Sequence, residues 1–110
     1  MILKRDVEVE GVKPQIYYAI GIVEAFYRSQ GLRCIVTSLV DGKHSEGSLH
    51  YKGLAVDIRT NNIPNDLLLQ LARQLHSALK PKGFDIVLEK THLHIEWDEK
   101  NQKEWLSRSD

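Results

Sequence analysis

The fold is decided towards the end of the chain, by the stretch Phe84-Asp85-Ile86-Val87-Leu88-Glu89-Lys90-Thr91-His92-Leu93-His94-Ile95-Glu96-Trp97. Its apolar and β-branched residues predict two strands, over 84–89 and 92–97, because such side chains suit a half-buried pleated surface. Only Lys90 and Thr91 separate the two runs, which is the length of a tight hairpin turn. The stretch therefore predicts an antiparallel pair of strands.

The residues before this hairpin alternate between helical and strand-like patterns. Apolar residues at helical spacing predict the helices, and β-branched apolar runs predict the strands. In chain order we expect a helix over 14–30, a strand over 32–39, a long loop over 40–53, a strand over 54–59 and a helix from Pro64 to Lys80. This order predicts an α+β domain with a small, mostly antiparallel sheet. Helices then cover one face of the sheet, and the other face is free for a site.

The totals describe one ordinary globular domain. With 110 residues the chain can build one core, so we predict a single domain over 1–110. Lys plus Arg and Asp plus Glu number 15 each, and this balance argues against binding to nucleic acid or to a membrane. The sequence shows no signal peptide and no membrane-spanning run, so we expect a cytoplasmic protein, and a monomer. Cys34 has apolar neighbours, which predicts a buried thiol.

Histidines gather in two places, His44 and His50 in the glycine-rich loop and His92 and His94 in the hairpin. Side chains two apart in a strand project from the same face, so His92 and His94 form a pair of imidazoles on one surface. Asp57 lies in a short apolar strand, where an unpaired carboxylate is costly to bury. Zinc is one suitable partner for it, and a hydrogen bond to the backbone or to an arginine is the ordinary alternative.

The histidine pattern carries a family resemblance. The stretch Ser48-Leu49-His50-Tyr51-Lys52-Gly53-Leu54-Ala55-Val56-Asp57, followed by His92-Leu93-His94, resembles the paired motifs of the D-alanyl-D-alanine metallopeptidases. That superfamily includes lysostaphin-type peptidases and hedgehog signalling domains, and residues 44–51 look especially like the hedgehog version. The resemblance implies a fold of this type with Zn²⁺ on the free face of the sheet, bound by His50, Asp57 and His94.

The resemblance also implies roles for other residues around the metal. His92 matches the first histidine of the superfamily's His-X-His pair, which stabilises the transition state. His44 matches a further histidine near the zinc in hedgehog domains. Arg59, just past Asp57, is a candidate to hold a substrate carboxylate, because no arginine follows the strand over 32–39 as it does in many carboxypeptidase relatives.

The general base is the point at which the sequence departs from the carboxypeptidase pattern. Thr91 stands three residues before the last ligand, where those relatives commonly have Glu or Asp. Glu89 ends the preceding strand and is the preferred base. Glu96, two residues past His94 and on the same face, is the second candidate.

The function expected from this resemblance is a zinc metallopeptidase that hydrolyses peptidoglycan stem peptides. Both D-Ala-D-Ala carboxypeptidase and L-Ala-D-Glu endopeptidase activity fit, and a phage lysis enzyme that leaves the host cytoplasm at lysis needs no signal peptide. The alternative is a zinc-containing hedgehog-like binding module without hydrolytic activity.

Overall fold

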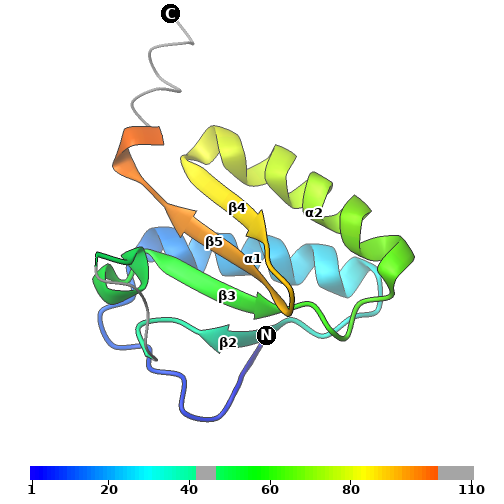
Figure 1. The fold of residues 1–110 in the computed structure, drawn as a ribbon, viewed down its shortest axis with the longest axis horizontal. Coiled ribbons are helices and arrows are strands. Elements are labelled where there is room, and N and C mark those ends of the chain that lie inside the picture. Colours follow the sequence, from blue (N-terminus) through cyan, green and yellow to red (C-terminus); the bar gives the residue numbers. More distant parts are fainter. Residues whose placement is uncertain (42–46, 102–110) are drawn as a thin grey trace, which may run out of the picture.

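Within residues 1–41 and 47–101, which the computed structural model describes, five strands form one sheet in the spatial order β1-β2-β3-β5-β4 (Figure 1). The strands are β1 (Ile2–Leu3), β2 (Ile35–Ser38), β3 (Ala55–Arg59), β4 (Phe84–Leu88) and β5 (His92–Trp97). The helices are α1 (Pro14–Ser29) and α2 (Asn65–Leu79), with two short 3-10 helices, η1 (Leu49–Lys52) and η2 (Lys80–Lys82). The domain is therefore α+β, as expected.

The hairpin predicted from the sequence is confirmed. β4 and β5 pair antiparallel, and the backbone N–H of Glu89 donates to the carbonyl of His92 at 2.8 Å, which leaves two residues in the turn. β5 also pairs antiparallel with β3, and this register sets Asp57 opposite His94 and Arg59 opposite His92. The register thus brings one acidic residue and two histidines together from segments far apart in the chain.

The expectation of a mostly antiparallel sheet holds in part, because the sheet is mixed and includes one parallel pair. β1 runs parallel to β2, while the other pairings among the described residues are antiparallel. Backbone N–H groups of Ile2 and Lys4 donate to the carbonyls of Cys34 and Val36, each at 2.8 Å. Two residues are too few to show the alternation by which strands are recognised in a sequence.

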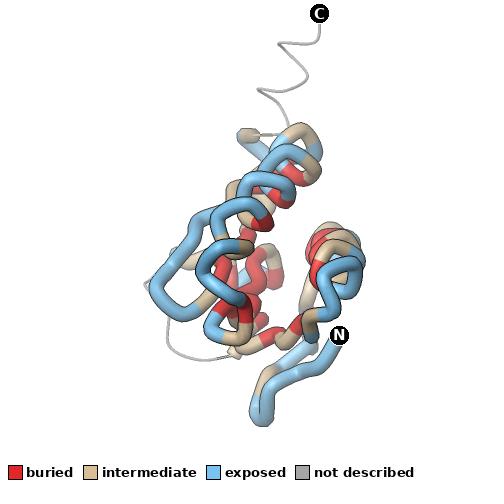
Figure 2. Tube along the Cα trace, turned by 90° about the vertical axis from the view of Figure 1, so that its right-hand side faces the viewer, coloured by how far each residue is buried: buried red, intermediate tan, exposed pale blue. Residues whose placement is uncertain are grey.

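Helices α1 and α2 cover one face of the sheet (Figure 1). Their apolar residues pack with the core-facing residues of the strands, among them Val56, Ile58, Leu93 and Ile95, and Figure 2 shows buried residues where helices and strands face each other. Because side chains alternate along a strand, Asp57 and His94 project from the opposite face. Among the described residues, no helix has both the length and the apolar character needed to cross a bilayer.

The predicted loop over 40–53 contains a short helix, η1, that positions His50. The Ser48 hydroxyl caps it by accepting the backbone N–H of His50 at 3.2 Å. Gly53 ends it in the left-handed conformation, at φ 72°. A Cβ atom at Gly53 would lie 2.0 Å from the carbonyl oxygen of Gly11, so only glycine fits this close approach. The backbone N–H of Lys13 in turn donates to the Gly53 carbonyl at 2.9 Å.

Candidate metal centre

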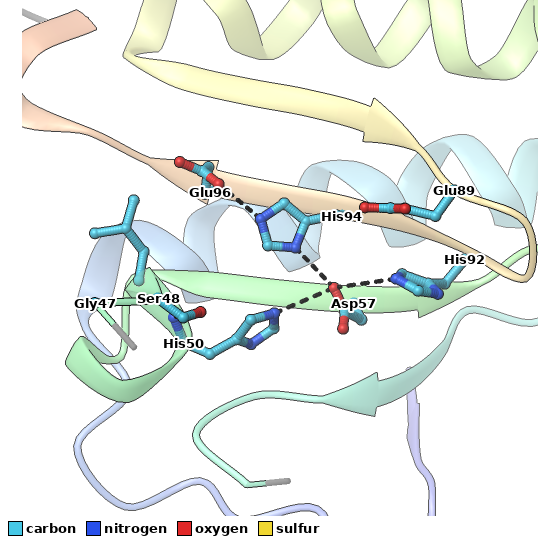
Figure 3. A pocket seen from close by; sticks show the side chains of 9 residues that line it. Gly47, Ser48, His50, Asp57, Glu89, His92, His94 and Glu96 are labelled. Carbon is cyan, nitrogen blue, oxygen red and sulfur yellow. Dashed lines mark hydrogen bonds and ion pairs between the residues drawn. The ribbon is translucent and has the colours of Figure 1, made fainter. Parts of the chain in front are cut away.

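Three side chains meet on the face of the sheet opposite the helices. Among the described residues, His50 from η1, Asp57 from β3 and His94 from β5 form a group that could hold a metal ion (Figure 3). One ligand atom from each lies within 4.8 Å of the others. Asp57 and His50 are buried, with 8% and 2% of their surface exposed, respectively. The three residues expected as ligands are therefore brought together.

The Asp57 carboxylate is the centre of this group. Its Oδ1 lies 2.9 Å from His94 Nδ1, 3.3 Å from His50 Nε2 and 3.7 Å from His92 Nε2, as the dashed lines in Figure 3 mark. Ligand bonds of about 2.0 Å in a tetrahedral zinc site place neighbouring ligand atoms about 3.3 Å apart. The separation between Asp57 and His50 matches that tetrahedral edge.

Each of the two imidazoles is held from outside by its other nitrogen. His50 Nδ1 donates to the Leu39 carbonyl at 2.6 Å, and His94 Nε2 donates to Glu96 Oε1 at 2.7 Å. In a neutral ring the nitrogen that faces Asp57 then carries no proton and presents a lone pair. Lone pairs converging on a carboxylate oxygen repel one another unless a cation or a proton lies between them. An outer acceptor on the second nitrogen is typical of metal-binding histidines.

The contacts within this group favour the negatively charged form of Asp57 and the positively charged form of His94. Burial alone would raise the pKa of Asp57, but hydrogen bonds from His50 and His94 outweigh it and hold that pKa well below its usual range. The hydrogen bond to Asp57 raises the pKa of His94 to about 9, against the opposing effect of burial and with further support from Glu96. Without a metal ion the group therefore keeps a proton on His94 at neutral pH, and a metal ion would displace that proton.

The group of His50, Asp57 and His94 opens into a pocket of about 520 Å³. Its lining includes two further residues expected in the site, Glu89 and His92, together with Glu96 and the segment from Gly47 to Leu49. Figure 3 shows Glu89 and His92 beside the metal-binding group. His44 lies outside the described residues. Arg59 does not line this pocket and instead lines a neighbouring one, of about 350 Å³, that shares Asp57 and His92 with it.

Comparison with known families shows which of the families with this pattern of two histidines and an aspartate the chain belongs to. Residues 15–97 match the model of the Hedgehog amino-terminal signalling domain. The chain belongs to the hedgehog signalling-domain family. It is 42% identical over 62 residues to an Indian hedgehog protein of Gallus gallus, and 40% identical over 62 residues to an Indian hedgehog B protein of Danio rerio. Each match covers 56% of this chain and 14% of the relative, so the chain corresponds to a small part of those proteins.

Membership of the hedgehog family corrects the expected function. The chain is a hedgehog-like module, and the expected peptidoglycan metallopeptidase, with its carboxypeptidase or phage-lysis role, is wrong because the matching family is a signalling domain. The peptidoglycan stem peptide is wrong as a partner for the same reason. The expected cytoplasmic location is also wrong, because hedgehog signalling domains are secreted. The catalytic roles expected for Glu89, His92 and His44 were tied to that peptidase activity, and their roles beside the metal-binding group stay predictions.

Two groups that orient the histidines were not identified from the sequence. The Leu39 carbonyl is a backbone group, so no side-chain pattern could point to its contact with His50. The sequence makes Glu96 only the second candidate for the base, whereas in the structure its carboxylate accepts a hydrogen bond from His94 Nε2. Its spacing of two residues from His94 on one strand was the available signal, since such neighbours share a face.

Proposed function

We propose that this hedgehog-like module binds Zn²⁺ through His50, Asp57 and His94, and that it uses the pocket around the metal to recognise a protein partner without hydrolysing it. The observation that supports zinc most strongly is the orientation of the imidazoles. The rings of His50 and His94 each direct one nitrogen at Asp57 Oδ1 while an outer acceptor holds the other. That arrangement belongs to metal-binding histidines.

The ligand types favour zinc over the other common divalent ions. Calcium and magnesium prefer oxygen ligands, whereas two imidazoles and one carboxylate suit zinc. Three protein ligands also leave a fourth tetrahedral position, which a water molecule or a group from a partner can take. The pocket of about 520 Å³ next to these ligands gives a partner access to that position.

We expect the partner to be a protein because the chain belongs to a family of signalling domains. A signalling domain acts by binding other proteins, and a receptor-type protein is the expected class of partner. Residues placed at the centre of a binding pocket contribute most to affinity. Glu89 and His92 line the pocket beside the metal ligands, so we assign them to partner contacts.

Zinc titration tests the proposal directly. Protein treated with a chelator is titrated with Zn²⁺ by calorimetry, and zinc content is measured after dialysis. We expect one zinc per chain, a higher melting temperature with zinc, and tetrahedral coordination in the visible spectrum of the cobalt-substituted protein. Absence of binding at micromolar zinc would contradict the metal site. Zinc-dependent cleavage of peptides would contradict the role as a binding module.

A further inference from the structure

A second pocket adjoins the metal centre on the same face of the sheet. Its volume is about 350 Å³, and it is lined by Lys4, Thr37, Asp57, Arg59, Asn61, Thr91 and His92. Asp57 and His92 also line the pocket of the metal centre, so the two pockets are contiguous. A ligand that reaches the metal can therefore extend into the second pocket.

The two pockets have opposite charge. The metal pocket contains the carboxylates of Glu89 and Glu96, whereas the second pocket contains the cations of Lys4 and Arg59. In the part of the chain that the structure describes, neither cation has a carboxylate partner within 4.0 Å. Asp57 is the acidic member of the second pocket, and its Oδ1 is engaged by histidines (Figure 3). Two cations with free donors therefore face a pocket that also holds hydroxyl and amide groups.

The backbone that carries these donors is fixed on both sides. Arg59 pairs with His92 across the sheet, and the buried Tyr27 hydroxyl donates to the Arg59 carbonyl at 3.0 Å. The backbone N–H of Lys4 donates to the carbonyl of Val36. The positions from which both cations project are set before any ligand binds, which lowers the entropic cost of binding.

The spacing along β3 sets the reach between the pockets. Arg59 is two residues after Asp57 on the same face, which corresponds to about 7 Å along a strand. The guanidinium group offers donors in a fork that matches a carboxylate, and Lys4 adds a second positive charge. One short acidic ligand can thus reach both the metal and the two cations.

We propose that Lys4 and Arg59 form a carboxylate-binding subsite next to the metal centre, for an acidic segment of a peptide partner that also reaches the metal. This assignment rests on the proposed role of the metal pocket in binding. It gives the partner an orientation, with the acidic group over β2 and β3 and the remainder over β5 and the end of β4.

Small dicarboxylates test the subsite without a known partner. Zinc-treated protein is titrated with glutarate and with its monoamide, which differ in one carboxylate, and acetate serves as a ligand for the metal alone. We expect glutarate to bind about tenfold more tightly than the monoamide, the effect of one charge-assisted contact. Arg59→Met should remove most of this preference, Arg59→Lys should keep part of it, and Arg73→Met on α2 should keep all of it.

Zinc content and circular dichroism are measured on every sample, so loss of metal or of fold is recognised separately. The affinities for glutarate and its monoamide are compared in every sample, whether or not that sample contains zinc. Bound zinc with equal affinity for glutarate and its monoamide would overturn the subsite and leave the metal site intact. A preference that survives in Arg59→Met would overturn it as well. Absence of zinc with a preference that depends on Arg59 would support the subsite and contradict the metal centre.

Discussion

His50 Nε2 faces Asp57 Oδ1 at 3.3 Å, although the two residues lie on different elements, η1 and β3. The hydrogen bond from His50 Nδ1 to the Leu39 carbonyl determines which nitrogen faces the carboxylate. Such an outer contact fixes the tautomer and the ring orientation of a metal ligand. The contact between His50 and Asp57 therefore depends on a backbone group from a third segment.

Removing one proposed ligand should abolish tight zinc binding. We expect His50→Ala to weaken zinc affinity by more than about 100-fold, because even loss of an outer partner of a metal ligand costs about 10–100-fold. His76→Ala is the matched control, since His76 is an exposed histidine on α2. Affinity is measured by competition with a chelator of known strength. Equal affinities of the two variants would remove His50 from the ligand set.

The Glu96 carboxylate should tune the metal without binding it. We expect Glu96→Gln to lower zinc affinity by about 10–100-fold, because its contact with His94 Nε2 at 2.7 Å orients that ring. Glu89→Gln is the control, since Glu89 lines the same pocket and its side chain has no hydrogen bond or ion pair to the described residues. Equal losses in the two variants would mean that the net charge of the pocket matters and the contact with His94 does not.

The sequence predicted the elements that bring the site together. Alternation along the hairpin predicted that His92 and His94 share a face, and both lie near Asp57 Oδ1 in the structure. The cost of burying an unpaired carboxylate in an apolar strand predicted that Asp57 has a partner, with zinc, the backbone and an arginine as candidates, and in the structure its Oδ1 lies close to three histidines. Periodicity and burial are properties of residue type, so they can be recognised before the fold is known.

Contacts made by the backbone and by very short elements could not be predicted. The Leu39 carbonyl that orients His50 leaves no trace in a side-chain pattern, and β1 has too few residues to show alternation. The reaction class was wrong for a different reason. Two histidines and an aspartate are a set that could hold a metal ion, but such a set does not by itself determine what the protein does.

Zinc affinity should rise with pH up to about 9. The hydrogen bond to Asp57 raises the pKa of His94 to about 9, so the metal-free protein carries a proton there at pH 7 that zinc must displace. Titrations in buffers of different ionisation enthalpy should show release of close to one proton per zinc. Glu96→Gln should release less, because it removes one support of the raised pKa. Zinc affinity that is constant between pH 6.5 and 9 would contradict this coupling.

The same shift should make the metal-free protein less stable at high pH. Because the folded pKa of His94 lies above its ordinary value of 6.5, its contribution is complete below pH 6.5 and is lost as the pH rises through about 9. Urea unfolding of chelator-treated protein at pH 6 and pH 9.5 measures the difference. His94→Gln should reduce the dependence on pH, and an unchanged dependence would assign it to other groups.

The Cys34 thiol should resist alkylation in the folded protein. It is buried on the helix-covered side of the sheet, and burial raises its pKa to about 11. The reactive thiolate is then scarce at pH 7.4, so we expect iodoacetamide to react more than about 100-fold more slowly than with a free cysteine. Addition of urea above the unfolding midpoint should restore the ordinary rate. Fast alkylation without urea would show that this part of the core opens readily.

Substitution of two glycines by alanine should have opposite effects on stability. At Gly53 the backbone has φ 72° and a Cβ atom would lie 2.0 Å from the Gly11 carbonyl oxygen, so Gly53→Ala should lower the free energy of unfolding by about 2 kcal/mol or more. At Gly21, inside α1, a Cβ atom meets nothing within 4 Å, so Gly21→Ala should raise it by about 0.5–1 kcal/mol. Urea unfolding measures both.

Because Gly53 ends the short helix that carries His50, Gly53→Ala should also weaken zinc binding, whereas Gly21→Ala should leave it unchanged. Loss of stability in Gly53→Ala with full zinc affinity would mean that the position of His50 does not depend on the contact between Gly53 and Gly11.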